Sequence, residues 1–274
     1  MDQAQQLRNV LKKQNQKVVK NTARVITVTS GKGGVGKSII TTIIGKNLAK
    51  IGKKVVLIDA DLGLKNLDVI MNIESRVVYD LDDLMKGRCP LSKALVQDKE
   101  YRSLFLLPAS MKTDVSKYKD DFLLTILNEL DKEFDFIIID CPAGIEKGFH
   151  IALKGAKEAL VVATLDKTSI RDADKVIGIL KSEDFMNIKL IINKIPRFNK
   201  NDDQLNIEDA SRILQIPILG VIYEDNGVKS EDFNKLSLLN TQNIAQIIFR
   251  LTGEKIAINK QNLFKRILKK VGLS

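Results

Sequence analysis

Gly31-Lys-Gly-Gly-Val-Gly-Lys-Ser38 stands between a β-branched run, Arg24-Val-Ile-Thr-Val-Thr29, and a helix-like stretch at 38–51. This order of strand, glycine-rich loop and helix fits the phosphate-binding pattern G-x-x-x-x-G-K-[ST]. Glycines let backbone N–H groups surround phosphate oxygens, and the helix directs its positive end at the same anion. We therefore expect the Ser38 hydroxyl to bind Mg²⁺ and the whole loop to bind nucleotide phosphates. The expected phosphate-binding residues are Gly31, Lys32, Gly33, Gly34, Val35, Gly36, Lys37 and Ser38.

The rest of the body alternates short apolar runs with helix-like stretches. Six further runs have strand character, at 55–58, 104–107, 136–139, 160–162, 190–192 and 218–222. Several are apolar throughout, as expected for strands buried on both faces of a parallel sheet. Helix-like stretches lie at 121–133, 170–180 and 207–214. The pattern predicts an α/β fold with a mostly parallel, twisted sheet of about seven strands, helices on both faces, and ligands at the carboxyl ends of the strands.

Charge divides the chain into a nearly neutral body and two basic ends. The 274 residues have a net charge of +10. Residues 1–24 contribute +5 and residues 250–274 contribute +6, so the body between them has a net charge of −1. A basic chain can bind nucleic acid, but a neutral body argues against that partner. We expect a basic N-terminal segment at 1–23, a P-loop domain at 24–252, and a linker with a terminal helix at 253–274.

Composition excludes several classes of protein. Two cysteines, Cys89 and Cys141, cannot build a disulfide framework and indicate a reducing cytosol. No stretch approaches the roughly 18 apolar residues of a membrane span, and the N-terminus lacks the apolar segment of a signal peptide. Aromatic residues make up 5% of the chain and Trp is absent, which leaves little material for stacking bases. The expected location is the cytoplasm.

Carboxylates follow two of the predicted strands. Asp59 and Asp61 follow the run at 55–58, and Asp140 ends the run at 136–139. An apolar strand that ends in Asp is a Walker B pattern, in which the carboxylate holds Mg²⁺ through water. Two carboxylates two residues apart at a strand end can both face the phosphate site, one near the metal and one near an attacking water.

The loop contains a second lysine, Lys32, which the general pattern does not require. With it the loop reads G-K-G-G-x-G-K-[ST] and resembles the deviant Walker A family of P-loop ATPases, which includes MinD, ParA, FlhG and the nitrogenase iron protein. In that family the extra lysine reaches across a dimer interface to the phosphates of the partner's nucleotide. The resemblance implies a catalytic role in trans for Lys32 beside Lys37, an ATP-dependent homodimer, and ATP with Mg²⁺ as cofactors.

Two further stretches resemble the switch regions of the MinD branch of this family. Ile58-Asp-Ala-Asp-Leu-Gly-Leu-Lys-Asn-Leu-Asp68 resembles switch I, and Asp140-Cys-Pro-Ala-Gly-Ile-Glu146 resembles switch II. By that resemblance Asp61 positions the hydrolytic water and Asp59 supports Mg²⁺ and its waters.

Base recognition is expected at Asn193 and Lys194, which end a strand where the family places an asparagine against the nucleobase. A guanine site would have Asp where this chain has Pro196, so we expect ATP rather than GTP. Leu165 and Tyr223 stand where MinD usually has Pro, and these departures bear on the adenine pocket.

The C-terminal segment has the pattern of a basic amphipathic helix. One face carries the apolar residues Leu263, Phe264, Ile267, Leu268 and Val271. Such a helix favours anionic lipid surfaces, and this one resembles the membrane-targeting helix of MinD. Two copies in a dimer raise avidity by about 10²–10⁴-fold. The segment predicts reversible peripheral binding to the inner face of the cell membrane.

The N-terminus leaves a second interpretation open, because Asp2-Gln-Ala-Gln-Gln-Leu-Arg8 resembles the FlhG segment that engages the GTPase FlhF. We expect first a MinD-type membrane-associated ATPase in division-site selection, with MinC- or MinE-like regulatory partners. The alternative is an FlhG-type ATPase that controls flagellar number and placement with an FlhF-like partner. A ParA-like DNA partition ATPase is a lower alternative. An iron-protein role is disfavoured because the residues around the two cysteines do not resemble that family's ligand segments.

Overall fold

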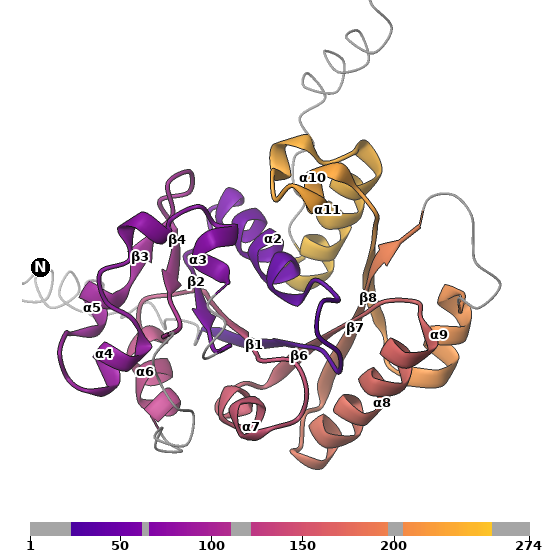
Figure 1. Cartoon of the computed structure of the whole chain (residues 1–274), viewed down its shortest axis with the longest axis horizontal. Coiled ribbons are helices and arrows are strands. Elements are labelled where there is room, and N and C mark those ends of the chain that lie inside the picture. Colours follow the sequence, from indigo (N-terminus) through magenta and orange to yellow (C-terminus); the bar gives the residue numbers. More distant parts are fainter. Residues whose placement is uncertain (1–22, 62–65, 111–121, 197–204, 254–274) are drawn as a thin grey trace, which may run out of the picture.

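One eight-stranded sheet organises the part of the chain that the computed structural model describes, which is residues 23–61, 66–110, 122–196 and 205–253 (Figure 1). Its strand order is β3-β4-β2-β5-β1-β6-β7-β8, and every neighbouring pair is parallel except β3 with β4. The strands are β1 (Arg24–Thr29), β2 (Val55–Asp59), β3 (Val96–Gln97), β4 (Leu104–Leu107), β5 (Phe136–Asp140), β6 (Glu158–Ala163), β7 (Asn187–Ile195) and β8 (Ile218–Tyr223).

Helices cover both faces of this sheet (Figure 1). The α-helices are α2 (Lys37–Lys50), α3 (Leu67–Ile70), α4 (Leu81–Met85), α5 (Leu91–Ala94), α6 (Phe122–Leu130), α7 (Lys147–Leu153), α8 (Lys167–Ser182), α9 (Ile207–Leu214), α10 (Asn226–Lys229) and α11 (Leu238–Thr252). Two short 3₁₀ helices are η1 (Glu74–Arg76) and η3 (Phe233–Lys235). Buried side chains of α2, α3 and α11 pack on one face, and those of α6, α7, α8 and α9 pack on the other. The predicted α/β sandwich of helices and parallel sheet is confirmed.

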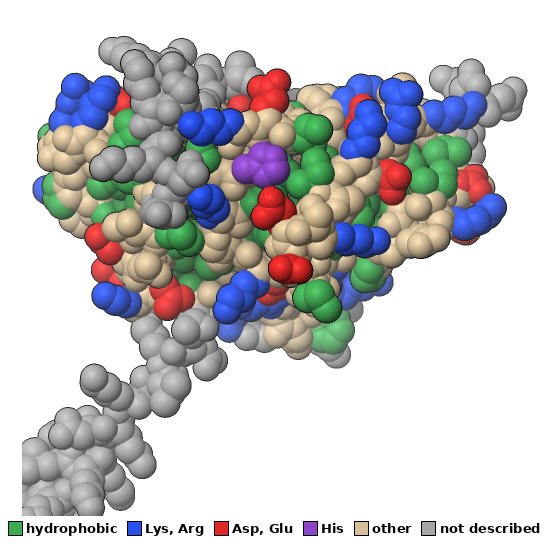
Figure 2. Space-filling view, turned by 90° about the horizontal axis from the view of Figure 1, so that it is seen from below, with side chains coloured by type: hydrophobic (Ala, Val, Ile, Leu, Met, Phe, Trp, Pro, Cys, Tyr) green, Lys and Arg blue, Asp and Glu red, His purple; other side chains and the backbone are tan. Residues whose placement is uncertain are grey.

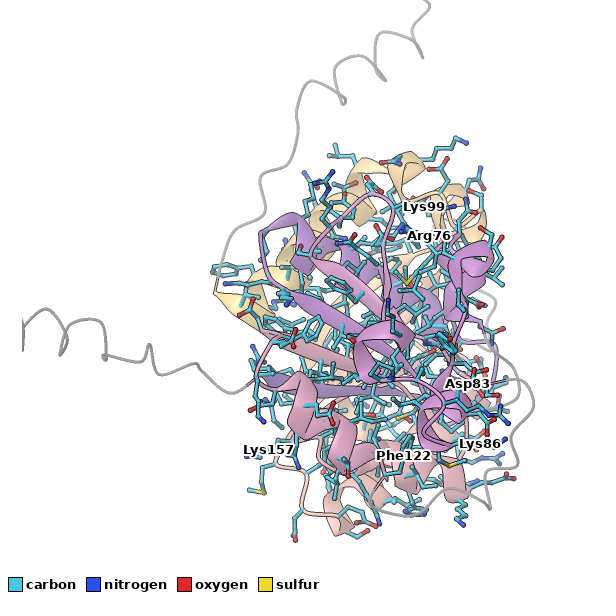
Figure 3. The ribbon with its side chains drawn as sticks, turned by 90° about the vertical axis from the view of Figure 1, so that its left-hand side faces the viewer. Arg76, Asp83, Lys86, Lys99, Phe122 and Lys157 are labelled. Atoms are coloured by element: carbon cyan, nitrogen blue, oxygen red, sulfur yellow. The ribbon has the colours of Figure 1, made fainter. Side chains whose placement is uncertain are left out.

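All seven predicted strands are present, and the eighth, β3, was not predicted. It has two residues, which is too short to show a periodic pattern, and it is the antiparallel edge of the sheet. Arg76 lies beside this edge and donates from Nη1 to the carbonyl of Gln97 at 2.9 Å. Figure 3 views the molecule from this side, with Arg76 close to Lys99.

The helix patterns were correct for α2, α8 and α9, and α6 lies within its predicted range. The sequence patterns did not predict α11. The Ser237 side chain caps the first turn of this helix by accepting a hydrogen bond from the amide of Asn240. None of the helices in the described residues is both long and apolar enough to cross a membrane. Both terminal segments lie almost wholly outside the described residues, so the boundaries at 23–24 and 252–253 stay predictions.

Candidate active site

Sheet register brings the predicted carboxylates together beside the glycine-rich loop. Asp59, at the end of β2, is the register partner of Asp140 at the end of β5. Strand β1 pairs with β5 on the other side, and the loop that leaves β1 leads into the first turn of α2. Residues from three separate parts of the sequence therefore meet at the carboxyl edge of the sheet, as expected for a parallel α/β fold.

Asp140 is the centre of a buried hydrogen-bond cluster. Its Oδ1 accepts from Lys37 Nζ at 3.0 Å and from Thr41 Oγ1 at 3.0 Å, and its Oδ2 accepts from Ser38 Oγ at 2.6 Å. The side chain of Asp140 is fully buried. Lys37 and Ser38 were predicted for this site, whereas Thr41 was not. The sequence spacing could have indicated Thr41, because this residue follows Lys37 by four positions and therefore lies on the same face of the helix.

Asp61 and Asp59 both lie beside this cluster and differ in environment. Asp61 Oδ2 is 4.0 Å from Lys37 Nζ. Asp59 is buried and accepts from the backbone amides of Asp61 at 3.1 Å and of Asn66 and Leu67 at 3.2 Å each. The amides keep the carboxylate in place at the start of switch I, whose residues 62–65 lie outside the described part.

The electrostatics of the cluster are dominated by burial. Burial and then the charge of Asp140 raise the pKa of Asp59 to about 7, against the lowering effect of its three amide donors. Burial raises the pKa of Asp61 too, although the ammonium of Lys37 opposes this. For Lys37 burial lowers the pKa, but Asp140 outweighs it and the pKa is raised. Asp59, Asp61 and Asp140 together carry more negative charge than the ammonium of Lys37 can neutralise. An added cation would relieve the repulsion among these carboxylates.

The loop backbone has two glycines at which a Cβ would collide with neighbouring atoms. Gly36 has φ +94°, and a Cβ there would lie 2.4 Å from Asn193 Nδ2. A Cβ on Gly31 would lie 2.2 Å from the backbone carbonyl of Asp172, because the loop packs directly against α8. The loop is therefore held between β7 and α8 with little freedom to shift.

Asn193 and Lys194 bind the loop from the end of β7. Asn193 Nδ2 donates to the carbonyl of Val35 at 2.8 Å, and Lys194 Nζ donates to the carbonyl of Gly34 at 2.6 Å. The Oδ1 atom of Asn193 is buried and has no hydrogen-bond partner among the described residues. A buried acceptor without a donor is costly, so this atom is available to a ligand group that donates.

A cavity of about 440 Å³ opens over the loop. Lys37, Ser38 and Asp61 line it at one end, and Lys194 and Glu231 are also among its lining residues. Lys194 and Glu231 both have positive φ, +54° and +56°, and such strain in residues other than glycine is often found at functional sites. Glu231 was not predicted, and the sequence carries no signal that a carboxylate after α10 would reach the loop.

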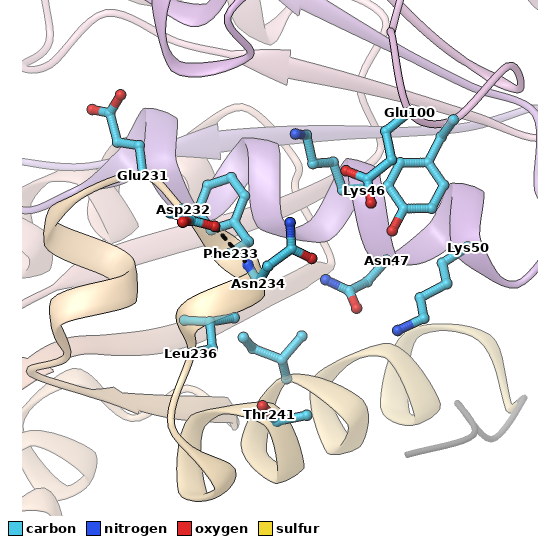
Figure 4. Close-up of a pocket in the computed structure, with 12 residues that line it drawn as sticks. Lys46, Asn47, Lys50, Glu100, Glu231, Asp232, Phe233, Asn234, Leu236 and Thr241 are labelled. Carbon is cyan, nitrogen blue, oxygen red and sulfur yellow. Dashed lines mark hydrogen bonds between the residues drawn. The ribbon is translucent and has the colours of Figure 1, made fainter. Parts of the chain in front are cut away.

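A second cavity, of about 160 Å³, lies against the C-terminal half of α2 (Figure 4). Phe233 forms one wall, and the ammonium of Lys46 lies 5.4 Å from the centre of its ring. Glu231 lines this cavity as well as the first one.

Lys32 does not join the Asp140 cluster. Its ammonium donates to Thr168 Oγ1 at 3.0 Å and to Asp166 Oδ1 at 3.3 Å, both at the start of α8. Within one chain, therefore, Lys32 points to α8 while Lys37 points to Asp140. The role of Lys32 in trans stays a prediction.

The remaining reactive side chains, Cys141 and His150, are not part of the Asp140 cluster. Cys141 is fully buried behind the site and hydrogen bonds to Thr27 Oγ1 at 2.6 Å, and burial raises the pKa of its thiol to about 12. His150 lies on α7, and its Nδ1 atom is 3.5 Å from Glu183 Oε1. Its side chain is exposed on the face that Figure 2 shows. Positive and negative side chains are interspersed on that face rather than gathered in a basic patch.

The chemistry of the cluster fits magnesium and a nucleotide. Ser38, Asp59, Asp61 and Asp140 offer only oxygen atoms, which Mg²⁺ prefers. Lys37 and the glycine backbone supply positive charge and amide donors for phosphates. Asp140, predicted to hold the metal, already shares a hydrogen bond with Ser38.

Comparisons with known proteins identify the family. A family model described as the CobQ/CobB/MinD/ParA nucleotide binding domain matches residues 26–238. The septum site-determining protein MinD of Synechocystis is 43% identical over 244 residues, which cover 85% of this chain and 91% of that protein.

Two solved structures have the same fold. MinD in the MinC:MinD cell division complex of Aquifex aeolicus is 43% identical with a TM-score of 0.74, covering 86% of this chain and 98% of that one. MinD of Pyrococcus horikoshii, complexed with Mg-ADP, is 26% identical with a TM-score of 0.73, covering 84% and 96%. The chain therefore belongs to the MinD/ParA family of nucleotide-binding ATPase domains, in its MinD branch.

Proposed function

We propose that this protein is a division-site selection ATPase that hydrolyses ATP with Mg²⁺ and switches between a free protomer and a membrane-bound homodimer. The observation that carries the proposal is the convergence of Lys37, Ser38 and Thr41 on buried Asp140, beside Asp59 and Asp61. Relatives at this level of identity are septum site-determining proteins, so the flagellar alternative based on residues 2–8 is not favoured.

In this proposal each group in the site has one task. Ser38 and Asp140 would hold Mg²⁺, which would neutralise phosphate charge, and Asp59 would support the waters of the metal. Lys37 would supply its ammonium to the nucleotide phosphates. Asp61 is poised beside Lys37 to orient the attacking water. Asn193 supplies its unpartnered Oδ1 to the nucleobase, where an amino group of adenine can donate to it.

The membrane and partner roles rest on different support. Residues 263–271 carry the apolar face of the terminal helix and lie outside the described residues. A MinC-like partner is supported by the Aquifex MinD that is found in a MinC:MinD complex. The net charge of −1 on the body between the two basic ends argues against nucleic acid as a partner.

Liposome co-sedimentation with ATP or ADP tests the proposal. We expect wild-type protein to sediment with anionic vesicles in ATP and to remain in solution in ADP. Asp61→Ala should retain ATP-dependent binding because it slows hydrolysis, whereas deletion of residues 262–274 should abolish binding. Equal binding in ATP and ADP would refute the switch. Co-sedimentation that survives the deletion would refute the terminal helix as the anchor.

A further inference from the structure

The Thr41 hydroxyl lies within hydrogen-bond distance of two acceptors. Its Oγ1 atom is 3.0 Å from Asp140 Oδ1 and 3.1 Å from the carbonyl oxygen of Lys37, one turn earlier in α2. The side chain of Thr41 is fully buried. A hydroxyl has a single proton to donate, so Thr41 gives its full hydrogen bond to one of these two acceptors at a time.

The Oδ1 atom of Asp140 in turn has two donors. Lys37 Nζ and Thr41 Oγ1 each lie 3.0 Å from it, whereas Oδ2 accepts from Ser38 at 2.6 Å. This carboxylate is fully buried, and a buried charged oxygen that loses its donors is costly. When the Lys37 ammonium is engaged elsewhere, Thr41 is the side chain within the described residues that still has a donor at Oδ1.

The next residue, Thr42, shows what a threonine does on this helix without a carboxylate beside it. Thr42 is also fully buried, and its Oγ1 donates to the carbonyl of Ser38 at 3.0 Å, again one turn earlier. Threonine hydroxyls in helices often bond in this way. The contact with Asp140 is therefore the feature that distinguishes Thr41 from its neighbour.

We propose that Thr41 is a positioning residue, whose hydroxyl takes over Oδ1 of Asp140 when the Lys37 ammonium is engaged by nucleotide phosphates, and which thereby keeps Oδ2 directed at Ser38 and the metal. This inference rests on the proposed function, because it assumes that Lys37 serves phosphates and that Ser38 and Asp140 hold Mg²⁺. Without nucleotide, Lys37 satisfies Oδ1 and Thr41 is free to donate to the carbonyl of Lys37. The hydroxyl therefore matters most in the loaded site.

Thr41→Val tests this role, because it removes the hydroxyl and keeps the branched shape of the side chain. We expect the full-length variant to bind Mg-ADP about 10- to 100-fold more weakly than wild type, the range for a hydrogen bond to a charged group. Calorimetric titration with ADP and Mg²⁺ measures the affinity and needs no turnover. Thr42→Val is the matched control and should keep the wild-type affinity. Thr41→Ser retains the hydroxyl and should restore it.

A double-mutant cycle with Lys37→Met tests the exchange of donors without nucleotide. In the wild-type background Thr41→Val should destabilise the fold no more than Thr42→Val does, because Lys37 still donates to Oδ1. In the Lys37→Met background it should lower the folded-to-unfolded equilibrium constant by about 10-fold more, because Oδ1 then has neither donor. Urea unfolding of the nucleotide-free proteins measures these losses.

Three results would each overturn the inference: equal ADP affinities in Thr41→Val and Thr42→Val, a Thr41→Ser protein as weak as Thr41→Val, or additive losses in the cycle. If the wild type does not bind Mg-ADP, the proposed function fails, while a non-additive cycle would still support the exchange of donors at Oδ1. If Lys37→Met does not fold, the ADP affinities of the three threonine variants decide.

Discussion

Lys37 Nζ lies 3.0 Å from Asp140 Oδ1, and the two side chains are 7% and 0% exposed. In this arrangement the lysine neutralises the carboxylate from the position that phosphate and metal would share. Binding of a magnesium nucleotide can therefore exchange one set of opposite charges for another without leaving a buried charge alone, which keeps the cost of desolvation low.

Lys37→Met should destabilise the nucleotide-free protein by about 3 kcal/mol, because it leaves the buried Asp140 carboxylate without its cation. Urea unfolding followed by circular dichroism measures this loss. Lys32→Met is the matched control in the same loop. Its partner is half exposed, so it should cost less than about 1 kcal/mol. Equal losses for the two variants would show that the Lys37–Asp140 pair does not stabilise the site.

Gly31→Ala should lower the free energy of unfolding by about 1–3 kcal/mol, the usual cost of overpacking. The new Cβ would lie 2.2 Å from the backbone of Asp172, which cannot rotate away as a side chain could. Gly33→Ala is the control, because a Cβ there meets nothing within 4 Å. Thermal unfolding of the two variants side by side checks the difference. A Gly31→Ala protein as stable as Gly33→Ala would show that the loop and α8 are not in contact.

The sequence predicted the parts of the site that depend on chain order. The loop, the strand ends and the seven longer strands all have local patterns, and parallel pairing then places Asp59 beside Asp140. Asp166 could not be assigned in the same way, because packing of α8 against the loop brings its side chain to Lys32. Glu231 depends on a left-handed residue after α10, which no periodicity indicates. The two-residue strand β3 is likewise fixed by its neighbour β4 rather than by its own residues.

Stability of the metal-free protein should fall as pH rises from about 4 to 7. Asp59 has a pKa of about 7 in the folded chain, against 3.8 for an ordinary Asp. Between these two pKa values the folded state binds more protons than the unfolded state. The contribution of Asp59 to the free energy of unfolding is therefore complete below the lower pKa and is lost as pH rises past the upper one. Asp59→Asn should flatten the profile, measured by urea unfolding at a series of pH values. A slope that is the same in both proteins would rule out Asp59 as its source.

Asn193→Ala should weaken ATP binding and reduce the preference for ATP over GTP. The variant loses the bond from Nδ2 to Val35, which holds the loop, and the free Oδ1 that we assign to the base. Each of these two hydrogen bonds contributes roughly 1–1.5 kcal/mol, so loss of either one should weaken the affinity by about 10-fold. Titration calorimetry with ATP and GTP measures both quantities. Asn193→Asp keeps the acceptor, so it should retain more discrimination than Asn193→Ala if the base contacts Oδ1.

Glu231→Gly should stabilise the fold while Glu231→Ala should not, because the strain at this position is in the backbone. Glu231 has φ +56°, where a residue with a Cβ pays about 1 kcal/mol that glycine does not. Both variants remove the carboxylate from the cavity over the loop. If the carboxylate contacts bound nucleotide, both should weaken ATP binding equally, although their unfolding temperatures differ. Binding that weakens only in Glu231→Gly would instead show that the backbone conformation at this position, and not the carboxylate, sets the affinity.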